Sequence, residues 1–365
     1  MKSQRKRKKG FGRFLFGLTA RTMMLAAAGL LVLSYLSMLV NPAKAWFMTF
    51  FGLLFVPFLL LNVILLLWAA KRRSGAFVIP LIALIPAFFL FGRYVQFKGG
   101  ELTGGEGTVK MVSYNVGSFA MFKDNSGVGG SEACADSVFA FLKRSDADII
   151  SLQEVSCGKG IDVRDFINGH LPGYNVEFFT SVDGHGSHGN VILSRYPVLR
   201  KGKFDFEDSS NLAFYVDLDI HGEVLRVYDC HFQSYNVSLP RVIDALSRKD
   251  EAMVHQTEEK MRASIKLRPQ QVGIVLKDIK ESPVESIVTG DFNDTPMSYT
   301  YYQLKQGKKD SFVEAGKGMG GTYSLLRPFV RIDYVLFPQK YDALAHKVFR
   351  LRWSDHYPIE TELKI

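Results

Sequence analysis

Three long apolar runs within the first 98 residues constrain this chain more than any other feature of its sequence. They extend from Thr22 to Val40, from Trp46 to Ala70 and from Ala76 to Phe97. Each is close to or longer than the roughly 20 residues that cross a hydrocarbon core about 30 Å thick. A cleaved signal peptide is an alternative for the first run, because Ala43-Lys44-Ala45 resembles a cleavage site. However, this run is longer than the usual signal core of about 7 to 15 residues, and two more runs follow, so we predict three transmembrane helices.

The charged residues are distributed unevenly along the chain. Residues 1 to 98 contain 14 of the 45 Lys and Arg residues and none of the 36 Asp and Glu residues, whereas positions 99 to 365 contain 31 basic and 36 acidic residues. A surface that holds long nucleic acids gains affinity from an excess of Lys and Arg. The second part of the chain lacks that excess.

The charges of the short loops predict a membrane topology. The head from Lys2 to Arg13 and the loop Lys71-Arg72-Arg73 are basic, whereas the loop from Asn41 to Ala45 has a single Lys. The positive-inside rule places both basic segments in the cytoplasm. We therefore predict a multi-pass protein of the plasma (inner) membrane whose C-terminal domain is extracytoplasmic.

The rest of the chain is predicted to form a linker and one large domain. Residues 99–107 are rich in glycine, as in flexible linkers, and residues 108–365 follow. Strand and helix patterns alternate there, and His221-Gly222 between two apolar strands indicates a hairpin. The charged segment from Pro240 to Lys280 predicts two helices interrupted near Pro269. Hairpins mixed with helices favour an α+β fold, a two-sheet α/β sandwich flanked by helices, over a doubly wound sheet.

Three cysteines, Cys134, Cys157 and Cys230, lie in apolar or strand-like surroundings. An odd number of cysteines cannot complete a disulfide framework. We expect buried thiols and assign them no function.

Polar residues recur at the ends of the predicted strands of the large domain. Asp291 and Asn293 are two residues apart, so an extended chain presents both on one side, although the sequence that follows also suits a simple Asx-turn. Asp333 lies among apolar residues and needs a partner if it is buried, for which His356 is a candidate. The full set is Asn115, Glu154, His231, Asp291, Asn293, Asp333, Asp355 and His356.

The segments that carry these residues resemble, in the same order, the motifs of the endonuclease/exonuclease/phosphatase superfamily. They are Ser-Tyr-Asn-Val at 113–116, Leu-Gln-Glu-Val at 152–155, Asp-Cys-His-Phe at 229–232, Gly-Asp-Phe-Asn-Asp at 290–294, Arg-Ile-Asp-Tyr-Val at 331–335, Ser-Asp-His-Tyr-Pro-Ile at 354–359, and the run from Gly189 to Pro197. The superfamily includes pancreatic deoxyribonuclease, abasic-site endonucleases, inositol polyphosphate 5-phosphatases and bacterial sphingomyelinases. The resemblance runs from about Val109 to the C-terminus and implies a deoxyribonuclease-like sandwich.

The resemblance implies a divalent metal ion as cofactor. Glu154 would be the main metal carboxylate, with Asn115 and Asp355 nearby in the metal and phosphate shell. Such oxygen ligands suit Mg2+, with Mn2+ as an alternative, whereas a zinc site would contain more His or Cys.

The resemblance also implies the catalytic roles. Asp291 would orient or deprotonate the attacking water, and Asn293 would hold the phosphate or Asp291. His231 and His356 would donate hydrogen bonds to phosphoryl oxygens, with Asp333 orienting His356. A cation, two imidazoles and a carboxylate base are groups that phosphoester hydrolysis can use.

A metal-dependent phosphoesterase acting on phosphodiester or phosphomonoester bonds is therefore the leading hypothesis, with a lipid head group or another small phosphoester as substrate. An exported nuclease acting on DNA or RNA is the second hypothesis, and an inactive binding scaffold is the third, ranked last because every expected catalytic residue type is present. The position of His231 resembles the nuclease, sphingomyelinase and phosphatase branches, whereas abasic-site endonucleases generally carry Tyr there. The expected partners are the phosphoester substrate and the lipid bilayer, and no protein partner can be inferred.

Basic residues of the charged segment from Pro240 to Lys280 offer limited support for the nuclease hypothesis. They alternate with acidic residues, as on a solvated helix face. These basic residues are Arg241, Arg248, Lys249, Lys260, Arg262, Lys266 and Arg268.

Overall fold

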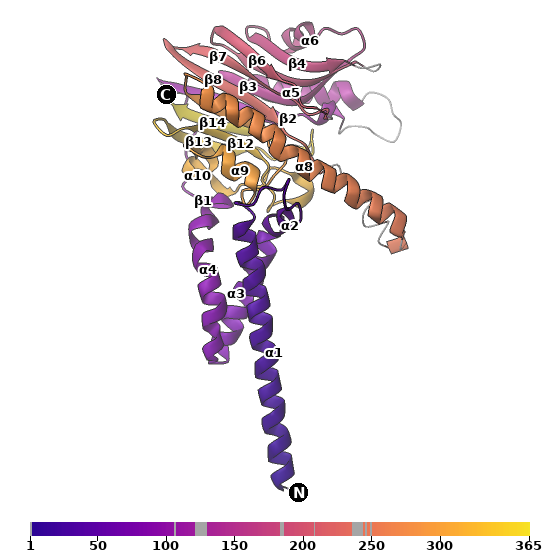
Figure 1. Ribbon diagram of the computed structural model, residues 1–365. Coiled ribbons are helices and arrows are strands. Elements are labelled where there is room, and N and C mark those ends of the chain that lie inside the picture. The colour runs from indigo at the N-terminus through magenta and orange to yellow at the C-terminus, as the bar shows by residue number, and fades with distance from the viewer. Residues whose placement is uncertain are drawn as a thin grey trace. The chain divides into compact units, whose positions relative to one another are not determined.

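The computed structural model describes residues 2–105, 107–120, 130–182, 186–207, 209–235, 244, 247–248 and 250–365. The chain forms two compact units (Figure 1). The first consists of the residues up to Gly92 and the short segment Met297–Tyr299, and the second of Arg93–Pro296 and Thr300–Ile365. We call the second unit the catalytic unit, because it contains the candidate catalytic residues predicted from the sequence.

The first unit is a group of apolar helices. They are α1 (Lys2–Leu36), α2 (Met48–Leu53), α3 (Phe55–Lys71), η1 (Gly75–Phe77) and α4 (Val78–Leu90), followed by η2 (Phe91–Arg93). The helices α1, α3 and α4 pack against one another, and polar side chains join them, since the Tyr35 hydroxyl donates to Ala83 O at 2.8 Å and Asn62 Nδ2 donates to Ala27 O at 2.9 Å. Large apolar side chains such as Leu67 and Phe88, exposed over 65% and 81% of their surface, point outward.

Two segments of this unit could cross a membrane by length and composition, namely Phe16–Leu36 and Gly75–Arg93. The predicted second span, residues 46–70, is instead divided into α2 and α3, and α3 has 17 residues, which is short for a complete crossing. The predicted third span extended to Phe97, but Val95–Phe97 form strand β1 of the catalytic unit. Two of the three predicted membrane helices are therefore long enough.

The catalytic unit contains two six-stranded mixed sheets. The first has the order β13-β14-β2-β3-β5-β4 and the second the order β10-β12-β9-β8-β7-β6. The strands of the first are β2 (Thr108–Asn115), β3 (Ile149–Gly158), β4 (Asn175–Val182), β5 (Gly186–Ser194), β13 (Asp342–Val348) and β14 (Ile359–Lys364). Those of the second are β6 (Val198–Phe204), β7 (Ala213–Ile220), β8 (Glu223–His231), β9 (Ser286–Asp291), β10 (Lys308–Asp310) and β12 (Asp333–Pro338). β1 (Val95–Phe97) pairs separately with β11 (Lys317–Met319).

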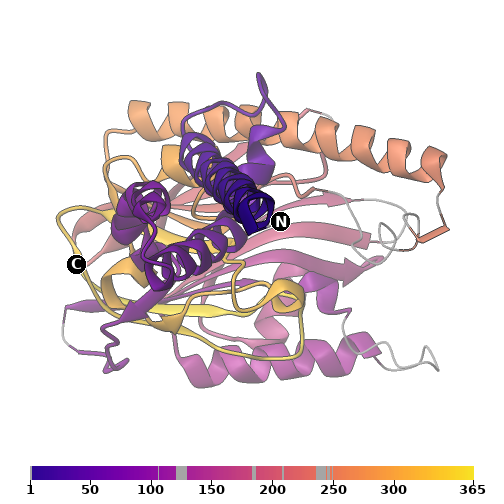
Figure 2. The same ribbon diagram turned by 90° about the horizontal axis from the view of Figure 1, so that it is seen from below.

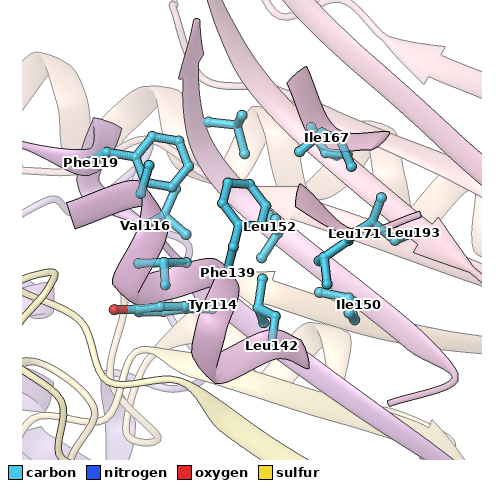
Figure 3. Close-up of a cluster of buried hydrophobic side chains, with 14 of the residues drawn as sticks. Tyr114, Val116, Phe119, Phe139, Leu142, Ile150, Leu152, Ile167, Leu171 and Leu193 are labelled. Atoms are coloured by element: carbon cyan, nitrogen blue, oxygen red, sulfur yellow. The ribbon is translucent and has the colours of Figure 1, made fainter. Parts of the chain in front are cut away.

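Helices cover the outer faces of both sheets. They are α5 (Gly130–Ser145), α6 (Val163–His170), α8 (Glu251–Glu281), α9 (Tyr299–Leu304) and α10 (Ser311–Ala315), with short turns η3 (Gly117–Phe119) and η4 (Ser324–Leu326). Leu142 and Ile167 pack from α5 and α6 against the first sheet (Figure 3). Val272 and Val275 pack from α8 against the second. α5 and α8 consequently lie on opposite sides of the strands (Figure 2).

The core between the sheets forms because successive side chains along each strand point to opposite faces of the sheet. In β7, Phe214 and Val216 face the inter-sheet core, while Ala213 and Tyr215 face the α8 side. The predicted hairpin is present, because β7 and β8 are joined by a turn at His221-Gly222 in which both residues have positive φ, 56° and 91°. The predicted two-sheet sandwich flanked by helices is confirmed.

The predicted break near Pro269 was wrong. α8 is one helix that contains this proline. The ring removes one backbone hydrogen bond. Ile265 and Val272 are buried on either side of it, so tertiary packing offsets the lost bond. Residues 240–243 of the same predicted segment lie outside the described residues.

We expect Leu142→Ala to lower the free energy of unfolding by about 2–5 kcal/mol, because it leaves a cavity under the first sheet where Leu142 is fully buried. Thermal unfolding of the full chain in detergent, followed by tryptophan fluorescence, measures the change. The matched control is Leu199→Ala on β6, where the side chain is 51% exposed and the expected change is within about 0.5 kcal/mol. Equal effects of the two substitutions would contradict this packing.

Candidate active site

The candidate site begins with strand registers that bring distant residues together. In the parallel pair β2–β3, Asn115 lies beside Gln153, whose neighbour is Glu154. In the parallel pair β8–β9, His231 lies beside Asp291, and the antiparallel pair β9–β12 sets Asp333 on the other side of Asp291. Because the carboxyl ends of parallel neighbours meet at one edge, each sheet collects its own polar residues there.

The carboxylate of Asp291 connects the two sheets. It is 1% exposed and accepts hydrogen bonds from Asn115 Nδ2 at 3.0 Å, Asn293 Nδ2 at 3.1 Å and the backbone N–H of Asn293 at 2.8 Å. Its Oδ2 lies 3.6 Å from His356 Nε2 and 3.8 Å from His231 Nε2. Burial, opposed by the nearby His356, raises the pKa of Asp291 to about 6. The Asx-turn considered from sequence is present, and the same carboxylate also faces the site.

The imidazole of His356 lies between two carboxylates. Its Nδ1 is 3.0 Å and 3.2 Å from the two oxygens of Asp333, and its Nε2 faces Asp291. Burial alone would disfavour the charged ring, but the carboxylates of Asp333 and Asp291 outweigh burial and hold the pKa of His356 well above its usual value. The Tyr323 ring packs edge-on against this imidazole at 5.4 Å. The partnership of Asp333 and His356 suggested by the sequence is therefore observed.

Glu154 is turned toward the site by an irregularity in β3. The pairing of β3 with β5 shifts register between Leu152 and Val155, and Glu154 has a left-handed φ of 56°. Its Oε1 accepts from Asn115 Nδ2 at 2.9 Å and lies 3.5 Å from His231 Nε2, and the side chain keeps 30% exposure. Burial acts to raise its pKa, but the nearby His231 and the Asn115 hydrogen bond lower the pKa overall. This carboxylate is thus ionised and open to solvent.

Asp355 joins the cluster through the loop before β14. The hydroxyl of Ser354 donates to Asn115 O at 2.7 Å and lies 3.4 Å from Asp355 Oδ1. A side chain at Gly117 would approach these atoms, since a Cβ there would lie 3.1 Å from Ser354 Oγ and 3.5 Å from Asp355 Oδ1. The eight residues predicted from the sequence therefore form one connected group.

Comparison with known proteins agrees with this geometry. Residues 112–356 match the Endonuclease/Exonuclease/phosphatase family.

The chain belongs to this family.

Residues 14–94 match a domain of unknown function (DUF8431), and no curated protein matches the chain. Solved structures similar to the chain include a family member from Beutenbergia cavernae, with 20% identity, 71% coverage of this chain and 72% of that chain, and a TM-score of 0.52. A humanised D. rerio TDP2 has 17% identity, 71% and 100% coverage, and a TM-score of 0.51. A family member from Bacteroides vulgatus has 19% identity, 71% and 99% coverage, and a TM-score of 0.51. These similarities show a shared fold.

Members of the endonuclease/exonuclease/phosphatase family hydrolyse phosphoester bonds and generally use a divalent metal ion. Two groups of side chains at the candidate site contain atoms that could bind a metal ion. Asp291, Asp333 and His356 have ligand atoms within 4.8 Å of one another. However, they are buried and already paired, because both nitrogens of His356 face carboxylates. We regard this set as a hydrogen-bonded relay.

The Glu154 side fits a hard cation better. Its carboxylate is ionised and partly exposed. A second acidic group, Asp355, is linked to Asn115 through the Ser354 hydroxyl. Oxygen donors of this kind suit Mg2+ or Mn2+. The Asn115 amide oxygen accepts from the Gly117 N–H at 3.0 Å, and the amide nitrogen orients Glu154, so Asn115 stays a predicted rather than an observed ligand.

One buried pair of polar residues beside the candidate site was not predicted from the sequence. Gln153 on β3 and Asp229 on β8 are both fully buried, and Gln153 Nε2 donates to Asp229 Oδ1 at 2.6 Å. This bond joins the two sheets one residue before Glu154 and two before His231. Burial raises the pKa of Asp229 well above its usual value, although hydrogen bonds from Gln153 and Ser151 act the other way. The sequence signal was weak, namely two polar residues inside apolar strands.

A second feature corrects the prediction that the basic residues of α8 are all solvated. Arg268 is 2% exposed, and its Nη1 lies 3.0 Å from Asp294 Oδ2. Its Nε donates to Gln233 O at 2.6 Å, and the guanidinium lies 4.4 Å from the Tyr235 ring. Arg268 therefore holds the segments that follow His231 and Asn293. Arg241 and Lys249 lie outside the described residues.

We expect Asp229→Asn to raise stability at neutral and alkaline pH. The pKa of Asp229 is raised on folding, so the folded protein keeps a proton that the unfolded chain releases above about pH 4. Stability therefore falls as the pH rises from the unfolded pKa toward the folded one. Asn has the same shape and cannot ionise, so the variant should unfold about 2–4 °C higher near pH 8 and match the unsubstituted protein near pH 4.

Thermal unfolding over this pH range measures the difference. Asp205→Asn, at a carboxylate that is 76% exposed, is the matched control and should leave the pH profile unchanged. An Asp229→Asn variant with the same decline toward high pH would show that the carboxyl is not protonated in the folded protein.

Proposed function

We propose that this protein is a membrane-anchored, divalent-metal-dependent phosphoesterase that hydrolyses phosphodiester or phosphomonoester bonds by attack of an activated water. The observation that carries the proposal is the arrangement of Asp291 and the paired side chains of His356 and Asp333 beside the partly exposed Glu154. A base, hydrogen-bond donors and a metal-binding carboxylate lie in one group.

Each residue has a role in this proposal. Glu154, Asp355 and Asn115 would hold Mg2+ or Mn2+, which would supply positive charge near the phosphoryl oxygens. Asp291, with a pKa near 6, is ionised at neutral pH and sufficiently basic to orient or deprotonate a water molecule. Asn293 fixes the Asp291 carboxylate.

The two histidines bind the phosphoryl group. His356, protonated between Asp333 and Asp291, donates hydrogen bonds from a fixed position. His231 approaches the site from the neighbouring strand, with its Nε2 near both Glu154 and Asp291. Their donors stabilise the negative charge that develops during hydrolysis.

The membrane part of the proposal rests on the apolar helices. Two segments are long and apolar enough to cross a bilayer, and the basic residues gather in the head and in the loop at Lys71. The positive-inside rule then places the head and this loop in the cytoplasm and the catalytic unit on the extracytoplasmic side, provided that α3 also crosses.

Replacing Glu154 by Gln, or Asp291 by Asn, should reduce the rate of hydrolysis by about 10²–10⁴-fold, because each change removes one charge from the reacting centre. The full chain in detergent is assayed with bis-p-nitrophenyl phosphate and p-nitrophenyl phosphate in Mg2+, Mn2+ or EDTA. Glu281→Gln and Asp205→Asn, at exposed carboxylates, are the matched controls. Activity that survives EDTA and both site substitutions would overturn the proposal, whereas a folded protein that hydrolyses neither ester would favour the inactive scaffold.

The same assay with plasmid DNA and RNA as substrates distinguishes an exported nuclease from an enzyme that hydrolyses small phosphoesters. Binding of nucleic acid weakens steeply between about 50 and 200 mM salt, whereas turnover of a small phosphoester does not. A preference for nucleic acid with such a salt dependence would favour the exported nuclease.

Protease added to cells from which any outer membrane has been removed should digest the catalytic unit when α3 crosses together with the two longer segments, because three spans export it. Immunoblotting against the C-terminal residues follows the digestion, and a cytoplasmic protein that stays intact shows that the cells are closed. Digestion only after lysis would place the unit in the cytoplasm.

A further inference from the structure

The loop Tyr323–Val330, between β11 and β12, presents three large apolar side chains to solvent. Leu325, Leu326 and Phe329 are 65%, 40% and 44% exposed. We call it the rim loop. Other large exposed apolar residues of the catalytic unit, within its described residues, occur singly along the chain, as Leu199 and Leu344 do. Single exposed apolar residues are ordinary, but a contiguous group marks a site of contact.

The base of the rim loop is fixed to the candidate active site. Ser324 N donates to Asp355 O at 2.8 Å, and the Tyr323 ring packs against His356. Thr322 lies just before the loop, and its hydroxyl oxygen accepts a hydrogen bond from the backbone N–H of Asp333 at 3.2 Å. The apolar side chains are therefore carried within a few residues of the groups that would bind phosphate.

Chain connectivity relates the rim loop to the candidate membrane span. The span Gly75–Arg93 ends one residue before β1, and β1 pairs with β11 in the register Val95 with Met319. Three residues then lead from β11 to Tyr323. Phe97, the last residue of β1, is itself 81% exposed.

Basic residues occur within the rim loop and in the segment that leads to Asp355. Arg327 lies within the rim loop, and Arg350 and Arg352 precede Asp355 by a few residues, all three exposed. Apolar side chains that enter the acyl region, combined with Arg at the level of the head groups, form the usual pattern of a surface that binds anionic lipid. Nucleic acid would use the charges but would leave the Leu and Phe side chains without a role.

On this basis, and resting on the proposed function, we infer that the substrate is a lipid phosphoester in a bilayer. Leu325, Leu326 and Phe329 bind its acyl region, while its phosphate reaches His231 and His356. The rim loop thus determines specificity, and it takes no part in the hydrolysis of a small soluble ester.

The test compares the full chain with a triple variant, Leu325→Ser, Leu326→Ser and Phe329→Ser, in mixed micelles of dodecyl maltoside with phosphatidic acid or phosphatidylglycerol. Release of phosphate or of the phosphorylated head group is measured against the mole fraction of lipid. The triple variant should lose about tenfold or more in kcat/KM for lipid, mainly through KM, because apolar contacts to the acyl region are removed. Its hydrolysis of bis-p-nitrophenyl phosphate should change less than about twofold, as uniform loss of lipid binding does not alter the chemical step.

The double variant Leu199→Ser and Leu344→Ser, at exposed positions on β6 and β13, is the matched control and should behave as the unsubstituted protein. If the soluble ester is cleaved but neither lipid is, or if the triple variant cleaves lipid normally, the inference is wrong and the proposed function stands. If the triple variant loses hydrolysis of lipid and of the soluble ester to the same extent, the rim loop is a structural element and the inference is likewise overturned. If the unsubstituted protein cleaves no ester, the proposed function itself fails.

Discussion

The hydrogen bond from Asn115 to the buried carboxylate of Asp291 is the interaction on which the rest of the site depends. Asn115 ends a strand of one sheet and Asp291 ends a strand of the other, and the bond is 3.0 Å long. The same amide nitrogen holds Glu154. One side chain, that of Asn115, therefore contacts both the partly exposed carboxylate of Glu154 and the buried carboxylate of Asp291. The Gln153–Asp229 bond repeats the link one layer deeper, so the two sheets cannot slide past one another at this edge.

Three carboxylates of the site differ in burial and in their hydrogen-bond partners. Asp333 is paired closely with His356, Asp291 is buried among several partners, and Glu154 remains partly open to water. Burial disfavours the charged form, while a nearby imidazolium favours it. The balance gives an ionised group at the surface and a more basic one inside. Chemically similar residues thus acquire separate tasks through the strand positions that hold them.

The sequence predicted most of this arrangement, for reasons that can be stated. Strand ends, the spacing of Asp291 and Asn293, and the need of Asp333 for a partner are local patterns, and the structure agrees with them. The Gln153–Asp229 pair could not be predicted, because its members are 76 residues apart and belong to different sheets. The continuity of α8 through Pro269 likewise depends on burial against the sheet, which a local pattern does not contain. The division of the second apolar run into α2 and α3 is also absent from its uninterrupted apolar pattern.

The left-handed backbone at Glu154 and Asn293, with φ of 56° and 52°, has a consequence for the evolution of this fold. A residue with a Cβ costs roughly 1–2 kcal/mol in that conformation, less for Asn, and glycine relieves the cost. Heat tolerance and turnover therefore favour different residues at these two positions. A change to glycine at either position would relieve the backbone but remove a side chain from the candidate site, so a gain in stability there is tied to a loss of the site's polar groups.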